Sequence, residues 1–393
     1  MSLSGAALKA QTAMHAPLSP AFRSEWCTVA ALESIADEWR ALAARALEPN
    51  VFYEPAFALA AAPVFGVDAG AVLVRTAGGR LAGLFPARIG RWRGGFTSML
   101  IGWTHPYAPL GTPLIDRDEP EAVIAAWLDH LGRDRAMPAQ LLLPFVPEQG
   151  AFAHALEMVL AGQGRCAAAF GHHERALLAP GVEREKYLES AMSGNKRKKL
   201  RRQRRRLADI APVTVTTATG APDIEGALKD FMVLEASGWK GLAGTAIVSN
   251  PAIQGFVQKA VVGLAAQGHA RIDRLVLNGI AIAATMTLQS GDTSWCWKIA
   301  YSEGFARSSP GVQLVCDLTE NLLAQPAPLR VDSCAAAGNP MIDHVWRERL
   351  ALSDRLIALR PSAMPFVLAC WIETLRRSAI AAARALRDRI RNR

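Results

Sequence analysis

The sequence lacks the features that would place it in a membrane or send it across one. No window reaches the roughly eighteen uninterrupted apolar residues that a membrane-spanning helix needs. The first twenty residues hold one Lys and no apolar core of about seven residues, so we expect no secretory signal. With 51% hydrophobic and 20% charged residues, the 393-residue chain is typical of one large or two ordinary packed domains.

Cysteine and histidine are scarce and scattered. The six cysteines form no C-x-x-C pair, and the eight histidines form no H-E-x-x-H motif. We therefore expect neither a metal site nor a disulfide framework, and a cytoplasmic, reducing location.

A general excess of positive charge is also missing, although the net charge is +9. The stretch 193–207, SGNKRKKLRRQRRRL, holds nine Lys or Arg and no acid, and without it basic and acidic residues balance at 35 each. The last eighteen residues, 376–393, hold seven Arg against one Asp. The body is mildly acidic, so anions are expected to bind at defined places rather than over the whole surface.

Two stretches of the chain share one order of predicted elements: three strands joined by tight turns, a helix and a short strand. The second stretch turns at Asn278-Gly279, the strongest short hairpin signal. The predicted strands are 72–74, 81–89, 96–103 and 140–145 in the first stretch, and 271–277, 280–288, 293–301, 329–332 and 350–359 in the second, with 213–217 between. The predicted helices are 31–47, 121–131, 151–160, 184–207, 222–239, 249–267 and 310–323.

This repeated order predicts an α+β protein with two tandem domains, each a mixed or antiparallel meander sheet flanked by helices. We expect a disordered N-terminus at 1–22, a first domain at 23–162, a second at 163–361, and an Arg-rich helix at 362–393.

The turn before the helix at 310–323 is a candidate anion site. Pro310 suits a first helical position, and Ser308 or Ser309 can cap the helix. The free N–H groups that follow, at the positive end of the helix dipole, favour a phosphate, and Arg307 stands beside them. An ordinary capped helix with a surface Arg fits the same residues.

Other candidates lie at element ends. A helix ends near Glu235, and Trp239 and Lys240 follow on a Gly-bounded turn that can line a cleft or simply be a buried Trp with an adjacent Lys. Asp332 closes a predicted strand and can serve as an acid or base. The motif G-x-G-x-x-A at 162–167 follows a helix instead of a strand, which argues against a dinucleotide site.

The basic helix within 184–207 needs an anionic neighbour, because nine cations on one helix repel one another. A phosphorylated cofactor, a nucleic acid or an acidic lipid would each serve. The stretch has no aromatic residue to stack on bases, which counts against single-stranded nucleic acid.

Four stretches carry a resemblance to a known family: SGNKRKKLRRQRRRL, FMVLEASGWKGLAGTAI, AYSEGFARSSPGVQLVCDLTENLL and DSCAAAGNPMIDHVWRERL. In this order they resemble the CelD-type branch of the GNAT acyltransferase superfamily, which is associated with cellulose or exopolysaccharide synthesis. The architecture is also similar to that of the FemAB peptidoglycan aminoacyltransferases. The resemblance covers about 170–350, and HPYAPLGTPLID supports it more weakly.

The resemblance implies that acyl-CoA, in particular acetyl-CoA, is the co-substrate, with its diphosphate on the turn already chosen. The cofactor-binding residues would be Lys298, Arg307, Ser308, Ser309, Gly311 and Val312. The usual glycines of this turn are replaced here, and Pro310 has no N–H to offer. Glu235 or Asp332 would be the general base, and Tyr301 would protonate the departing thiolate. Trp239 and Lys240 would face the substrate.

The leading hypothesis is therefore an N- or O-acyltransferase acting on a small or saccharide-linked acceptor. One alternative is an aminoacyl-tRNA-dependent transferase, in which the basic helix holds tRNA. Another is a non-catalytic accessory protein of polysaccharide synthesis. In any of these, the segment 363–393 can contact the inner membrane surface peripherally, because it joins a Trp/Phe/Leu face to Arg, or it can pack on the domain as a terminal helix.

Overall fold

The computed structural model describes residues 22–91, 98–181, 184–325, 330–336, 338–360 and 363–391. Its centre is one 13-stranded mixed sheet in the order β1-β2-β3-β4-β6-β13-β7-β12-β11-β10-β9-β8, with β5 beside β3. The strands are β1 (Phe22–Thr28), β2 (Ala69–Thr76), β3 (Leu81–Gly90), β4 (Met99–Gly102), β5 (Leu114–Ile115), β6 (Gln140–Pro147), β7 (Ala167–Leu178), β8 (Val213–Ala218), β9 (Ala270–Leu277), β10 (Ile280–Ser290), β11 (Thr293–Tyr301), β12 (Arg330–Asp332) and β13 (Glu348–Ala358).

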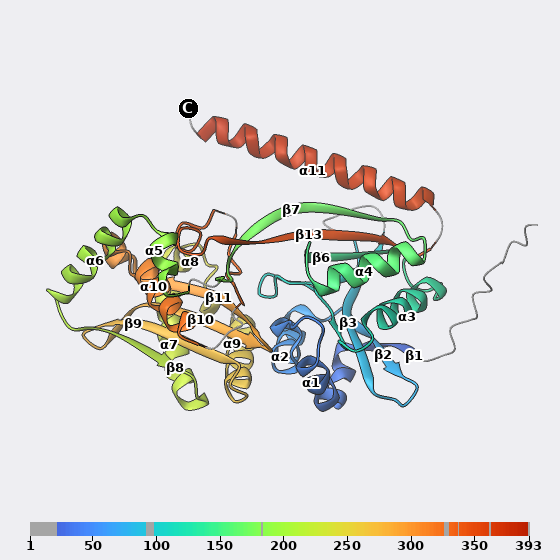
Figure 1. Ribbon diagram of the computed structural model, residues 1–393, viewed down its shortest axis with the longest axis horizontal. Coiled ribbons are helices and arrows are strands. Elements are labelled where there is room, and N and C mark those ends of the chain that lie inside the picture. Colours follow the sequence, from blue (N-terminus) through green and yellow to red (C-terminus); the bar gives the residue numbers. More distant parts are fainter. Residues whose placement is uncertain are drawn as a thin grey trace, which may run out of the picture.

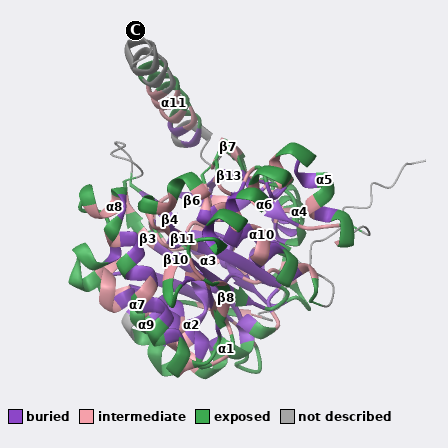
Figure 2. Cartoon of the chain, turned by 90° about the vertical axis from the view of Figure 1, so that its left-hand side faces the viewer, coloured by how far each residue is buried: buried purple, intermediate pink, exposed green. Residues whose placement is uncertain are grey.

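Helices flank this sheet, and the predicted α+β fold class is confirmed (Figure 1). They are α1 (Ala36–Ala44), α2 (Pro55–Phe65), α3 (Pro120–Arg133), α4 (Ala151–Gly162), α5 (Tyr187–Ala191), α6 (Gly194–Ala208), α7 (Ala221–Ser237), α8 (Trp239–Leu242), α9 (Pro251–Ala265), α10 (Pro310–Leu323) and α11 (Ala363–Arg391). Figure 2 shows the strands buried beneath the partly exposed helices. Among the described residues, no helix is both long and apolar enough to cross a bilayer.

The second predicted meander is β9, β10 and β11, paired antiparallel. Its first turn has positive φ angles at both Asn278 and Gly279, as a tight turn of the hairpin type requires. The first meander is β2, β3 and β4, although the expected turn at Gly94-Gly95 lies outside the described residues. The N-terminal segment that we expected to be disordered, 1–22, also lies outside the described residues, except for residue 22, which begins β1.

Two long strands join the halves of the sheet. β13 pairs antiparallel with β6 on one side and with β7 on the other, and β7 continues to β12. The last strand of the chain therefore lies between β6 and β7, across the expected domain boundary near residue 163. That boundary stays a prediction.

Some elements differ from the expectation. β1, α2 and β7 were not predicted; α2 contains Pro63, which argues against a helix, and β7 has small and polar residues at AAAFGHHER. The basic helix is broken at Met192, because the Ser193 hydroxyl accepts the Lys196 N–H and starts α6 anew.

An aromatic cluster holds the two halves against each other. α2 packs on α9, and the rings of Phe65 and His105 stack at 4.3 Å. Phe256 meets Tyr107 edge to face at 5.6 Å. Burial lowers the pKa of His105 to about 3, so this imidazole is neutral and acts as an aromatic surface.

Candidate functional site: an opening between two strands

The strands β11 and β12 diverge after a short parallel contact. Within the described residues, they pair only where Thr293–Trp295 meets Arg330–Asp332. Beyond it, Ser333 turns its N–H to the Ala176 carbonyl of β7, while β11 continues to Tyr301 with β10 on its other side. Among the described residues, no strand pairs with this side of β11 from Cys296 onward, so this edge can meet a ligand carbonyl.

A cavity of about 240 Å³ fills this opening. It brings together five of the residues that the sequence analysis singled out: Glu235, Trp239, Lys240, Lys298 and Tyr301. They come from α7, α8 and β11, and the first and the last are 66 positions apart in the sequence. Glu303, Cys334 and Met341 are among the other lining residues.

Lys298 is a cationic side chain of this cavity whose surroundings shift its pKa. Its ammonium lies 4.2 Å from the centre of the Tyr107 ring and 5.6 Å from that of Trp297. Burial, reinforced by repulsion from Lys240, lowers the pKa of Lys298 to about 8, against the opposing pull of Glu235. The side chain is thus cationic at neutral pH but loses its proton readily.

Tyr107 is held in place from the C-terminal half. Its carbonyl oxygen accepts the indole N–H of Trp297 at 2.8 Å. Tyr107 was not among the site residues predicted from the sequence, because its stretch, HPYAPLG, carried only a weak family resemblance.

Glu235 is buried and fully engaged. One carboxylate oxygen accepts the Lys240 ammonium at 2.6 Å, and the other accepts the Ile247 N–H at 2.8 Å. Gly238 follows the last residue of α7, three residues after Glu235, as expected for a glycine at a helix end. By contrast, Trp239 is 62% exposed at the rim, which excludes the buried-Trp interpretation.

Asp332 does not face this cavity. It is buried and forms an ion pair with Arg175, 2.8 Å between Oδ2 and Nη2, while Oδ1 accepts the Cys334 N–H. Arg175 in turn donates to the Pro109 carbonyl, so the pair links β7, β12 and the loop before β5. No motif pointed to this partner, which lies 157 residues away in the sequence.

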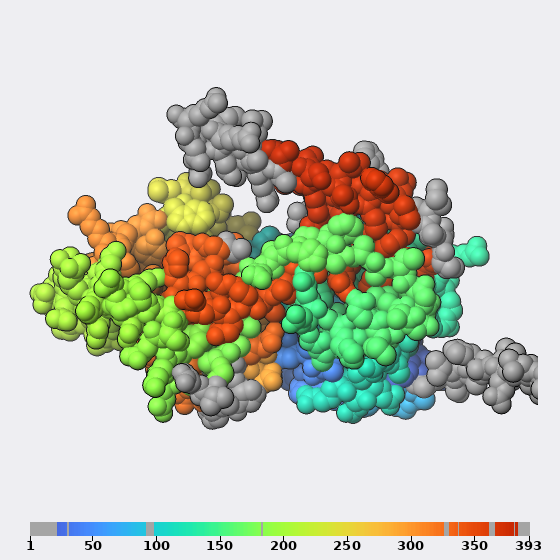
Figure 3. All heavy atoms as spheres, turned by 45° about the horizontal axis from the view of Figure 1, so that its top comes forward, coloured from blue at the N-terminus to red at the C-terminus, as the bar shows by residue number. Residues whose placement is uncertain are grey.

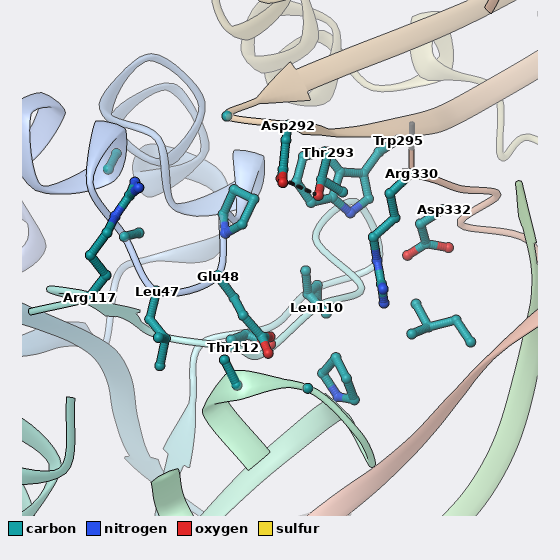
Figure 4. A pocket seen from close by; sticks show the side chains of 18 of the residues that line it. Leu47, Glu48, Leu110, Thr112, Arg117, Asp292, Thr293, Trp295, Arg330 and Asp332 are labelled. Atoms are coloured by element: carbon teal, nitrogen blue, oxygen red, sulfur yellow. Dashed lines mark hydrogen bonds between the residues drawn. The ribbon is translucent and has the colours of Figure 1, made fainter. Parts of the chain in front are cut away.

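Asp332 lines a second, larger cavity of about 490 Å³ between the two halves (Figure 4). Glu48 and Arg330 lie across it from each other, and Arg117 stands at one end. Burial raises the pKa of Glu48, against the opposing effects of the Phe152 N–H that it accepts and of nearby Arg330. No sequence motif pointed to these residues.

The predicted anion turn lies at the end of β11 but lines neither cavity. Ser309 is the N-cap of α10, as predicted, with φ 52°, but its side chain makes no capping hydrogen bond, which differs from the expectation. Gln203 of α6 explains the difference: its amide donates to the Arg307 carbonyl at 2.6 Å and to the Ser309 hydroxyl at 3.3 Å.

Gly311 lies at the first turn of α10, beneath the cavity wall. A Cβ there would approach the Met341 sulfur to 3.1 Å and the Tyr301 ring to 3.4 Å. The N–H groups of Gly311 and Val312 belong to a first helical turn, where no intrahelical acceptor exists. Tyr301 and Met341 thus stand between the cavity and this helix end.

The basic helix α6 lies beside the same turn. Two of its cations are engaged: Arg204 with Asp317 of α10 and Arg197 with Glu189. Six others are exposed: Lys198, Lys199, Arg201, Arg202, Arg205 and Arg206. In the described part of the chain, no group of three or more His, Cys, Asp and Glu side chains is arranged to hold a metal.

Comparison with known proteins agrees with this architecture. Residues 194–336, which contain α6 to β12 and most of the cavity, match the family described as acetyltransferase (GNAT) domain. This match supports the sequence-based prediction of a GNAT-type acyltransferase. No curated protein matches the chain significantly.

Two solved structures share the fold over most of the chain. The crystal structure of FemX has a TM-score of 0.55 and 12% identity, covering 86% of this chain and 98% of that one. The C-terminal domain of a putative lysylphosphatidylglycerol synthetase from Agrobacterium fabrum has a TM-score of 0.53 and 11% identity, covering 87% and 96%. At such identities the likeness concerns the fold alone.

Proposed function

We propose that this chain transfers an acyl group from a coenzyme A thioester to an amine or hydroxyl, in the opening between β11 and β12. The observation that carries the proposal is the cationic Lys298 side chain at the free edge of β11. Backbone N–H groups and a cation fixed beside one carbonyl oxygen stabilise the negative charge that acyl transfer creates there.

The reaction needs a donor, an acceptor and one base. The acceptor nitrogen or oxygen attacks the thioester carbon, and the resulting oxyanion lies against Lys298 and the β11 edge. The C–S bond then breaks, the coenzyme leaves as a thiolate, and the Tyr301 hydroxyl protonates it. Glu235 receives the acceptor's proton once Lys240, which is only partly buried, has moved aside.

The donor's diphosphate would lie past Tyr301, at the end of β11. Arg307 is exposed there, and the N–H groups of Gly311 and Val312 point out of the first turn of α10. Ser308 and Ser309 complete the turn. Gln203 fixes its backbone, so the turn has one shape before a ligand arrives.

The melting temperature of the full-length chain tests donor binding. We expect millimolar acetyl-CoA to raise it, and Arg307→Ala to weaken the shift about tenfold in apparent affinity, because a charge-assisted phosphate contact is lost. Arg133→Ala, on the exposed end of α3, is the matched control and should leave the shift unchanged. A wild-type melting temperature that acetyl-CoA does not move would contradict the choice of donor.

A second candidate donor is aminoacyl-tRNA, favoured by the six exposed cations of α6 beside the same turn. Exchanging four of them, Lys198, Arg201, Arg202 and Arg205, for Gln should then abolish tRNA binding in a gel shift at low salt. Exchange of Arg204, which is paired with Asp317, should matter less. Absence of any tRNA shift in the wild type eliminates this donor.

The acceptor we propose is small or saccharide-linked. Trp239 is exposed at the rim and Lys240 lies just inside, an arrangement that suits a sugar ring carrying a polar group. The link to cellulose or exopolysaccharide synthesis rests on the CelD-type resemblance.

A further inference from the structure

The face of α11 that lies against the sheet is anchored mainly by charged groups. Phe366 and Ala369 are buried at its start, against β4, β6 and β13. Two turns later, Arg377 pairs with Asp354 of β13 at 2.8 Å and with Glu373 of its own helix at 2.6 Å. Figure 3 shows this part of the helix as a ridge over β7.

The opposite face of α11 is apolar and open to solvent. Val367, Leu368, Trp371 and Leu375 are 47%, 56%, 63% and 64% exposed. Their spacing of three to four residues puts them on one stripe, about half a turn away from Phe366, Glu373 and Arg377. This amphipathicity is inverted, because a surface helix ordinarily turns its apolar stripe inward.

The chain that continues from this stripe is strongly basic. Residues 376–393 hold seven Arg and one Asp. An apolar stripe with a Trp, next to many arginines, is the composition of helices that lie in the interface of an anionic bilayer. A second copy of the chain is the less favourable occupant, because it carries the same excess of arginine, whereas an anionic lipid surface carries the opposite charge.

We propose that α11 docks this protein onto an anionic lipid surface, with Val367, Leu368, Trp371 and Leu375 in the interface and the arginines that follow Arg377 against lipid phosphates. We place a second contact at α8, which exposes Trp239 and Leu242 at 62% and 89% and lies in the half of the molecule toward which α11 extends (Figure 1). Docking would bring the rim of the 240 Å³ cavity close to the lipid headgroups. The docking proposal does not depend on the acyl-transfer proposal.

Sedimentation of the full-length chain with lipid vesicles tests the docking. We expect binding to vesicles of phosphatidylcholine with phosphatidylglycerol, and little binding to phosphatidylcholine alone. The double variant Trp371→Ser, Leu375→Ser should lose at least about tenfold in vesicle affinity, because two apolar side chains no longer leave water. The control Ile210→Ser, Ile280→Ser removes two side chains that are 69% and 70% exposed elsewhere, and should bind as the wild type does.

A second pair of variants tests the charge. Exchange of Arg384, Arg387, Arg389 and Arg391 for Gln should weaken vesicle binding by about fivefold per charge at low salt. The same number of exchanges on α6, at Lys198, Arg201, Arg202 and Arg205, should weaken it far less. Three results would overturn the proposal. The wild-type protein stays in the supernatant, or the α6 exchanges alone abolish vesicle binding. The third is a wild-type dimer that the double variant Trp371→Ser, Leu375→Ser dissociates.

Discussion

The ammonium of Lys298, on the last strand of the second meander, lies 4.2 Å from the centre of the Tyr107 ring, which belongs to the first half of the chain. The cation at the centre of the candidate site thus depends on contact between the two halves. Neither half alone would give this lysine the same surroundings.

The ring of Tyr107 should therefore matter more than its hydroxyl. Tyr107→Phe keeps the aromatic face beside the cation and should retain most of kcat. Tyr107→Leu removes a cation–π contact of about 1–2 kcal/mol and should lower kcat roughly tenfold. Steady-state kinetics with acetyl-CoA compares the two, and equal losses would contradict the contact's role.

Transfer should depend on pH through Lys298. The protonated form stabilises the oxyanion, so kcat/KM should fall as the pH rises through about 8, the pKa of this lysine. Lys298→Arg stays charged and should move that decline to higher pH, whereas Lys298→Met should lose at least about a hundredfold in rate at every pH. One acceptor is used throughout, so that its own ionisation cancels from the comparison. If the Lys298→Arg variant loses kcat/KM at the same pH as the wild type, the decline belongs to another titrating group.

The same lysine should cost the protein stability. The pKa of an unfolded lysine is about 10.5, whereas folding lowers the pKa of Lys298 to about 8. Lys298 therefore lowers the free energy of unfolding by its full amount below pH 8, and this loss of stability disappears as the pH rises from 8 to 10.5. Lys298→Met should raise the free energy of unfolding by about 1–2 kcal/mol at pH 7, after allowance for partial exposure, and by almost nothing at pH 10.5. Urea titrations at the two pH values measure this, and a variant less stable than the wild type at pH 7 would be the contrary result.

Asp332 should be a structural residue. Asp332→Asn leaves Arg175 buried without its counter-ion and should lower the free energy of unfolding by about 3 kcal/mol. The double variant Arg175→Met, Asp332→Leu should recover much of that loss. If Asp332→Asn instead folds normally and loses activity, the sequence-based assignment as general base is the better one.

Gln203 should act on the donor through the turn that it holds. Gln203→Leu removes both hydrogen bonds to the turn and should raise KM for acetyl-CoA several-fold with little change in kcat, because the turn loses its fixed shape. Gln267→Leu, a partly buried glutamine in the turn after α9, is the matched control. A change confined to kcat would place the effect at the reacting atoms instead.

Local patterns in the sequence predicted much of the fold. The Asn278-Gly279 turn and the apolar runs on either side of it are short-range signals, and the second meander follows them closely. β7 and β13 depend instead on each other: their pairing joins residues about 180 positions apart, and no local signal specifies that.

The candidate site divides in the same way. Glu235, Trp239, Lys240, Lys298 and Tyr301 stand near element ends in the half that carried the family resemblance, and the structure brings them together. Tyr107, Arg175 and Gln203 reach the site or its supports from distant segments. Such partners depend on how the halves pack, which one sequence does not contain.

A crystal structure of the full-length chain with acetyl-CoA would show where the donor lies relative to Lys298 and α10. The thioester carbonyl should lie within hydrogen-bonding distance of the Lys298 ammonium, with the diphosphate at the N–H groups of Gly311 and Val312. Coenzyme bound instead in the larger cavity between Glu48 and Arg330 would contradict the account.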